Sequence, residues 1–306
     1  MPNSSTVMTF LLLGFSDTWE QNVLCFILLL VIYLSALTAN LLIISAVSLD
    51  QHLHTPMYFF LVNLSVVDLG AISVTIPSAM IDSLLNTWEI LYSGCIAQVY
   101  SLFFFLGSDL FLLTGMAYDR YVAICDPLHY ETVMDRKVCI KMAASAWLAG
   151  FLYSGLHTGS TFAITFCSNV INQFFCEIPQ LLKASCDNLY LIEFGFVVFS
   201  AFIAFFCFSF IIVSYVHIFK SVLRIPTTQG RNKAFSTCVP QLIVVSLFSS
   251  TGSFAYLKPK SPSPSDLDLV VAVLYSVVPP LMNPIVYTMR NKAIKTALVK
   301  LLLPWC

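Results

Sequence analysis

The sequence has few charged side chains. Only 10% of its 306 residues are Asp, Glu, Lys or Arg, whereas about a quarter of the residues of a soluble globular protein are charged. Hydrophobic residues make up 58% of the chain, and its mean hydropathy is +0.85. A chain of this length with so little polar surface is not a water-soluble domain, and the composition indicates a membrane protein.

Signatures of several functional classes are also missing. A net charge of −1 leaves no basic excess for a nucleic-acid-binding surface, so we expect no nucleic-acid partner. The chain has no His-Glu-x-x-His or Gly-x-Ser-x-Gly pattern, no phosphate-binding loop and no Cys/His pair with the spacing of a zinc site. Its halves do not repeat, as those of many transporters do. We therefore expect no enzyme, with a membrane transporter as a weak alternative.

The chain contains long apolar stretches. Five uncharged runs are each long enough to cross a bilayer as a helix of about 20 residues, and two further runs carry a single acid in their interior, Asp68 in one and Asp109 in the other. We therefore predict an all-α membrane protein, a seven-transmembrane helix bundle over residues 22–290. The expected spans are 22–49, 56–85, 94–125, 138–160, 191–222, 232–257 and 267–289.

The basic residues predict how the bundle is oriented. With the N-terminus outside, twelve of the fifteen Lys and Arg residues fall on the cytoplasmic side and only Lys183, Lys258 and Lys260 fall outside, as basic residues near span ends prefer. Residues 1–21 are then an extracellular tail with a glycosylation sequon at Asn3, and residues 291–306 are a cytoplasmic tail. This tail alternates basic and apolar residues, which favours a short amphipathic helix on membrane lipid; Cys306 is either lipidated or a free thiol.

Four cysteines fall on the expected outer side. Cys95 begins the third span, and Cys167, Cys176 and Cys186 lie in the long loop between the fourth and fifth spans. Disulfides persist outside the cell, and four cysteines allow three pairings. A bridge from Cys95 to the loop would hold that loop over the mouth of the bundle, whereas four unpaired or loop-internal thiols would not.

Charged residues inside apolar spans are candidate functional residues. Asp119 and Arg120 are adjacent at the inner end of the third span, where they form either a switch or an interfacial arginine that reaches toward the lipid headgroups. Asp68 and Asp109 lie deep in the membrane, where an ionisable group is a functional candidate or a protonated, hydrogen-bonded acid. Asn283 and Pro284 interrupt the seventh span as a hinge or a fixed kink.

Five segments, in this order along the chain, resemble the odorant receptor family. Residues 53–61 read LHTPMYFFL, 116–130 read MAYDRYVAICDPLHY, 214–215 read SY, 233–238 read KAFSTC and 280–287 read PLMNPIVY. The terrestrial-type branch, class II, is the closer fit. The resemblance extends from about residue 40 to residue 291 and implies a rhodopsin-like receptor in the plasma membrane. Such a receptor binds small volatile odorants and activates a stimulatory heterotrimeric G protein to raise cyclic AMP; a receptor for another small lipid-like ligand is the alternative.

The resemblance also implies roles for particular residues. The activation switch and G-protein contact would consist of Asp119, Arg120, Tyr121, Tyr215, Asn283, Pro284 and Tyr287. Asp68 and Asp109 would hold a sodium ion or a shared proton, with no other cofactor, and the disulfides would be Cys95–Cys176 and Cys167–Cys186. The odorant pocket, in the outer half of the bundle, would be lined by Leu102, Phe103, Leu106, Gly107, Phe199, Ile203, Phe248, Ser249, Tyr256 and Ser276.

The sixth span departs from the family pattern. KAFSTC is usually followed by a Ser-His-Leu step, but here Val239 is followed by Pro240, Gln241 and Leu242. A glutamine thus replaces a titratable imidazole. The usual Phe-Tyr-Gly step is Phe248-Ser249-Ser250, so the expected pocket tyrosine is absent. Activation schemes that need that histidine or tyrosine do not apply unchanged to this chain.

The expected orientation predicts that Asn3 is glycosylated. Glycosidase treatment of the wild-type chain should therefore lower its apparent mass, and Asn3→Gln should remove this shift. A wild-type chain whose mass is unaffected by glycosidase would contradict an extracellular N-terminus.

Overall fold

The computed structural model describes residues 9–15, 18–186, 190–224, 227–257 and 266–302. Asn3 and Cys306 lie outside this part of the chain.

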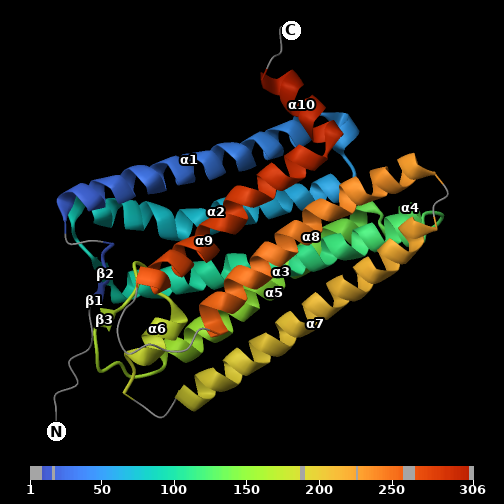
Figure 1. Ribbon diagram of the computed structural model, residues 1–306. Coiled ribbons are helices and arrows are strands. Elements are labelled where there is room, and N and C mark those ends of the chain that lie inside the picture. Colours follow the sequence, from blue (N-terminus) through green and yellow to red (C-terminus); the bar gives the residue numbers. More distant parts are fainter. Residues whose placement is uncertain (1–8, 16–17, 187–189, 225–226, 258–265, 303–306) are drawn as a thin grey trace.

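Seven long helices, as counted in the described residues, form one elongated bundle (Figure 1). They are α1 (Trp19–Leu49), α2 (Pro56–Leu85), α3 (Tyr92–Cys125), α5 (Arg136–Phe162), α7 (Tyr190–Leu223), α8 (Thr228–Leu257) and α9 (Asp266–Arg290). Each of the seven expected spans lies inside one of these helices. Six of the helices are long and apolar enough to cross a membrane when only described residues are counted; α8 is not among them.

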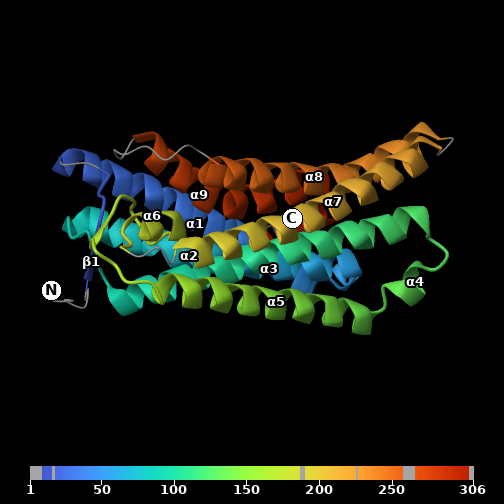
Figure 2. The same cartoon turned by 90° about the horizontal axis from the view of Figure 1, so that it is seen from below.

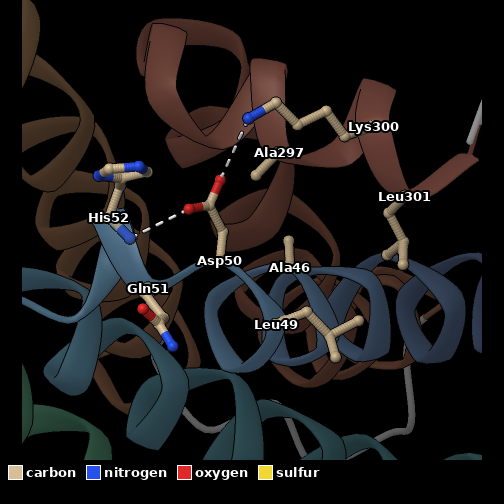
Figure 3. Close-up of a pocket in the computed structure, with 8 residues that line it drawn as sticks. All are labelled: Ala46, Leu49, Asp50, Gln51, His52, Ala297, Lys300 and Leu301. Atoms are coloured by element: carbon tan, nitrogen blue, oxygen red, sulfur yellow. Dashed lines mark hydrogen bonds and ion pairs between the residues drawn. The ribbon is translucent and has the colours of Figure 1, made fainter.

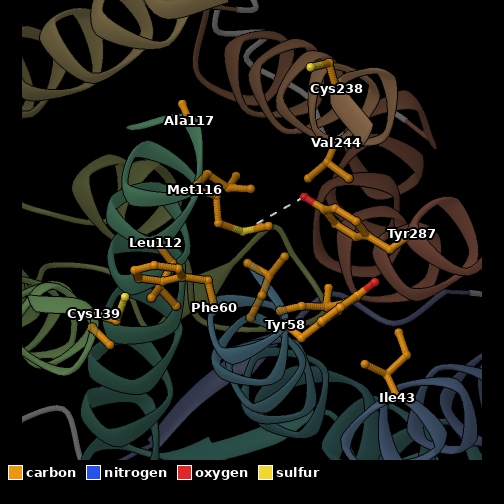
Figure 4. Packing of buried hydrophobic residues seen from close by; sticks show 14 of the residues in the cluster. Ile43, Tyr58, Phe60, Leu112, Met116, Ala117, Cys139, Cys238, Val244 and Tyr287 are labelled. Carbon is orange, nitrogen blue, oxygen red and sulfur yellow. Dashed lines mark hydrogen bonds between the residues drawn. The ribbon is translucent and has the colours of Figure 1, made fainter. Parts of the chain in front are cut away.

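Helix α3 lies in the middle of the bundle. It packs against α2, α5, α7 and α8, and the view from below places it between α2 and α5 (Figure 2). The largest cluster of buried apolar side chains surrounds its C-terminal half, and Figure 4 shows Leu112, Met116 and Ala117 of α3 within that cluster. Movement of a neighbouring helix therefore changes the packing around α3.

A short helix follows the bundle at the cytoplasmic end. Helix α10 (Lys292–Leu302) buries Ile294 and Ala297 and exposes its lysines, which is an amphipathic arrangement. Asn291 begins it by accepting hydrogen bonds from the backbone N–H groups of Ala293 and Ile294. Its amide also donates to the Tyr58 hydroxyl of α2 at 3.0 Å, so the corner between α9 and α10 is joined to the bundle.

A cleft of about 400 Å³ separates α10 from the end of α1 (Figure 3). The short helix η1 (Gln51–Leu53) forms part of its wall. Lys300 reaches across the cleft to within 3.8 Å of Asp50. Because the Lys300 side chain is largely exposed, this ion pair contributes little to stability.

The opposite end carries a small sheet that the all-α prediction did not include. Strand β1 (Thr9–Leu12) lies between β2 (Glu89–Leu91) and β3 (Val170–Ile171), antiparallel to the first and parallel to the second. Phe10 is fully buried, with its ring against those of Tyr92 and Phe166.

Two disulfides hold the loop that contributes β3. Cys95 of α3 is bonded to Cys176. Cys167 is bonded to Cys186, and these two cysteines lie before and after the short helix α6 (Ile178–Lys183) in the chain. These are the pairs that the family resemblance implies. The side chain of Gln98, one turn after Cys95, accepts a hydrogen bond from the Cys176 N–H at 2.8 Å. The loop is thus fixed to α3 by a covalent bond and a buried hydrogen bond.

Close packing of α3 on α5 depends on Gly150. A Cβ atom at this position would lie 2.2 Å from the Ser108 Oγ and 2.8 Å from the backbone oxygen of Phe104. Gly155, one turn further along α5, has nothing within 4 Å of the corresponding position. The two glycines therefore form a matched pair for testing this contact.

We expect Gly150→Ala to destabilise the receptor by about 1–3 kcal/mol, because the added methyl group forces α3 and α5 apart. Gly155→Ala should be neutral or slightly stabilising, since alanine favours the helix. Thermal unfolding of both purified variants checks the difference. Equal melting temperatures for the two variants would show that the α3–α5 contact is less tight than described.

Candidate functional site

The charged pair near the C-terminal end of α3 is closed. The Arg120 Nε donates to the Asp119 Oδ2 at 2.9 Å, and a second guanidinium nitrogen contacts the same oxygen. Asp119 is only 1% exposed. Its other oxygen accepts from the Tyr130 hydroxyl at 2.7 Å. Both carboxylate oxygens are therefore satisfied, which stabilises a buried charge.

Tyr130 is a site residue to which the sequence assigned no role. It begins the short helix α4 (Tyr130–Val133) in the loop after α3. Burial and the neighbouring Asp119 raise the pKa of its hydroxyl above the usual value, so Tyr130 stays a neutral hydrogen-bond donor. The one feature of the sequence that could have pointed to Tyr130 is that it is the last residue of the family-like segment MAYDRYVAICDPLHY. The loop thereby contributes directly to closing the charged pair.

Tyr215 and Tyr287, which the resemblance assigned to the activation switch with Arg120, have other partners here. The Tyr215 hydroxyl of α7 donates to the Gln241 Oε1 of α8 at 2.8 Å. The Tyr287 hydroxyl of α9 points toward the Met116 Sδ of α3, at 4.0 Å (Figure 4). Both tyrosines are buried. In this arrangement Arg120 is bound to Asp119, and each tyrosine hydroxyl is directed to a partner other than Arg120.

Asn283 and Pro284 connect α9 to the helices beside it. Pro284 has no N–H to donate to the carbonyl oxygen of Pro280, one turn earlier. The Asn40 amide of α1 supplies the missing donor at 2.9 Å. The Asn283 amide donates to both carboxylate oxygens of Asp68 in α2, each at 3.1 Å. The interrupted part of α9 is thus held by side chains of α1 and α2.

Asp68 and Asp109 lie close enough in the core to interact electrostatically, and they are 3% and 4% exposed. Two oxygens at this place are buried with no hydrogen-bond partner among the described residues, namely the Asp109 Oδ1 and the Oδ1 of Asn283, whose amide nitrogen contacts Asp68. Carboxylate and amide oxygens are ligands for a hard cation. The residues present fit a sodium ion, and they fit a shared proton on the two acids equally well.

The expected odorant wall is brought together in part. Leu102 and Leu106 of α3 pack in one apolar cluster with Tyr275 of α9. Phe103 stacks on His157 of α5, with ring centroids 5.2 Å apart. Ser276 in α9 is buried, Ser249 in α8 and Ile203 in α7 are partly buried, and the side chains of Phe248 and Tyr256 lie outside the described residues.

Two expected wall residues face elsewhere. Phe199 is 53% exposed and shares the outward stripe of α7 with Phe202 and Phe206, so its helical position directs it to lipid. Gly107 faces α5, since a Cβ atom there would meet Tyr153 and Gly150 at 3.2 and 3.4 Å. It therefore allows helix packing. His157, which lies beside Phe103 and bonds to Ser200 of α7 at 2.5 Å, is a polar group of this region that the sequence did not single out as a wall residue.

The fold has a counterpart among solved structures. Squid rhodopsin has the same fold, with a TM-score of 0.71 over 95% of this chain and 87% of that protein, at 17% identity. The family is defined by closer sequence similarity. The family model for olfactory receptors matches residues 29–304. Olfactory receptor 14A16 of Homo sapiens is 50% identical over 97% of this chain and 96% of its own length.

Two further human proteins are similar over nearly their full length. Olfactory receptor 14C36 is 48% identical over 99% of this chain and 97% of its own length. Olfactory receptor 14I1 is 50% identical over 98% of this chain and 97% of its own length. The chain belongs to the olfactory receptor family and is a multi-pass membrane protein.

Proposed function

We propose that the chain is an odorant receptor of the plasma membrane with its N-terminus outside. It binds small, mostly apolar volatile molecules in the outer half of the bundle and activates the stimulatory olfactory G protein, which raises cyclic AMP. The chain itself performs no chemistry. The observation that carries this proposal is the closed Asp119–Arg120–Tyr130 cluster at the cytoplasmic end of α3, within a chain of this family.

The mechanism is a shift between two populations. In the closed form Arg120 is occupied by Asp119, and Tyr215 and Tyr287 are bound elsewhere. An odorant that binds the open form more tightly shifts receptors toward that form. Opening then frees Arg120 and the cytoplasmic loops for the Gα subunit. The apolar groups near Leu102 and Phe103 suit a volatile ligand, with a few hydroxyl groups to orient it.

The cytoplasmic helix α10 supports a second contact, with membrane lipid. Ile294 and Ala297 are buried against the bundle, while Val299 and Leu302 are exposed beside the lysines. Such a helix lies in the interface, with its apolar groups in the lipid and its basic groups near anionic headgroups.

We further propose that a sodium ion or a shared proton between Asp68 and Asp109 stabilises the closed form. The buried, unpartnered oxygens around the two acids support this role. The Asn283 amide, which donates to Asp68, connects the site to the interrupted part of α9. An ion that holds these groups together would oppose movement of α9 during opening.

Arg120→Ala should abolish the rise in cyclic AMP that an odorant panel produces with the wild-type receptor, because the Gα subunit loses its main contact. Lys183→Ala removes a basic residue from the expected outer side and should signal as the wild type does. Responses are compared at equal amounts of receptor on the cell surface. An equal response in Arg120→Ala and wild type would refute the role of this arginine.

Sodium chloride should raise the melting temperature of the purified receptor relative to choline chloride at the same ionic strength. At ten times the dissociation constant, an ion that binds only the folded form adds about 1.4 kcal/mol of stability. Asp109→Asn should remove the difference between the two salts. A wild-type receptor that melts at the same temperature in both would exclude sodium and leave the shared proton.

A further inference from the structure

Gln241 joins three helices through its side-chain amide. Its Oε1 accepts from the Tyr215 hydroxyl of α7 at 2.8 Å, and its Nε2 donates to the backbone oxygen of Leu113 in α3 at 2.7 Å. Gln241 is 1% exposed and Tyr215 is 2% exposed. Both hydrogen bonds therefore lie in the interior, where water does not compete for them.

These bonds matter because α8 packs far more extensively on α9 than on α3 or α7. Gln241 therefore supplies polar links on the side of α8 where packing is sparse. Leu113 is two helical turns before Arg120, so one link ends on the face of α3 that carries the charged pair. The other link ends on Tyr215 and directs its hydroxyl toward α8, so the Tyr215 O–H is donated to Gln241 and not to another group.

We propose that Gln241 is the positioning residue that keeps the cytoplasmic half of α8 against α3 and α7 and withholds Tyr215 from Arg120 until an agonist opens the bundle. This inference rests on the proposed function in one respect, because the expected rise in cyclic AMP requires that opening of the bundle activates the G protein. Movement of α8 away from α3 leaves the Tyr215 hydroxyl and the Gln241 amide buried without partners unless each finds a new one, and this cost favours the closed form.

Glutamine suits this role in a way that histidine does not. An amide offers a donor and an acceptor at every physiological pH, whereas an imidazole offers both only while it is neutral and two donors once it is protonated. The replacement of the family's usual histidine by Gln241 therefore makes the closed form insensitive to pH at this position.

Two variants break the bridge in different ways. Gln241→Met keeps the length of the side chain but removes the donor and the acceptor, and Gln241→Asn keeps the amide but is one methylene too short to reach both partners. Ser246→Ala is the matched control, because the Ser246 hydroxyl bonds only to Leu242 of its own helix among the described residues and lies on the exposed face of α8.

The first measurement is cyclic AMP without odorant, per receptor at the cell surface. Both Gln241 variants should raise it by about tenfold, the effect of one to two net hydrogen bonds on the ratio of open to closed receptor. Ser246→Ala should match the wild type. Adding Arg120→Ala to Gln241→Met should remove the rise.

The second measurement is amide hydrogen exchange of the purified receptors in lipid nanodiscs, which requires no G protein. The cytoplasmic turns of α8 should exchange faster in both Gln241 variants than in Ser246→Ala. Exchange and basal signalling equal to those of Ser246→Ala would overturn the role of Gln241. Faster exchange together with a wild-type receptor that never raises cyclic AMP would instead support the role of Gln241 and refute the proposed function.

Discussion

The bilayer removes water as a hydrogen-bond partner, so polar groups inside this bundle must satisfy one another. Few such groups are present, and the ones described here join helices that are distant in the sequence. Asn40 of α1 reaches the Pro280 carbonyl of α9, and Asn283 of α9 reaches Asp68 of α2. Gln241 joins α8 to α3 and α7. These bonds are directional, so they hold only in one arrangement of the helices.

The two ends of the bundle are held by different kinds of bond. At the end that carries the sheet, Cys95–Cys176 and the three strands fix the loop to α3 covalently and through backbone pairing. At the other end, the Asp119–Arg120–Tyr130 cluster and the Tyr215–Gln241 bond are made by side chains alone. Side-chain hydrogen bonds can break and form again without cleavage of a covalent bond or separation of a strand. The end that carries the sheet, where a ligand would bind, is thus held rigidly. The end that carries Arg120, where a partner would dock, can change between arrangements.

Much of this architecture was predictable from the sequence, because a bilayer imposes a length and a polarity on each span. The helices contain the expected spans, and Asp119 pairs with Arg120 as their adjacency indicated. Side-chain direction was less predictable. The family resemblance assigned Phe199 and Gly107 to the ligand wall, but a resemblance in sequence does not tell which neighbour a helix face meets. The bridge made by Gln241 was hidden for the same reason, since its partners are distant in the sequence.

The place of β1 in its sheet has a consequence for biosynthesis. This strand is among the first segments to be synthesised, yet its parallel partner β3 is not made until α5 has been completed. The segment around Phe10 therefore cannot complete its sheet until four long helices have been synthesised. Pairing across so long a stretch of chain is slow. Closure of this sheet is then a late step in maturation, and export from the endoplasmic reticulum would be sensitive to substitutions at Phe10 that leave the mature helices untouched.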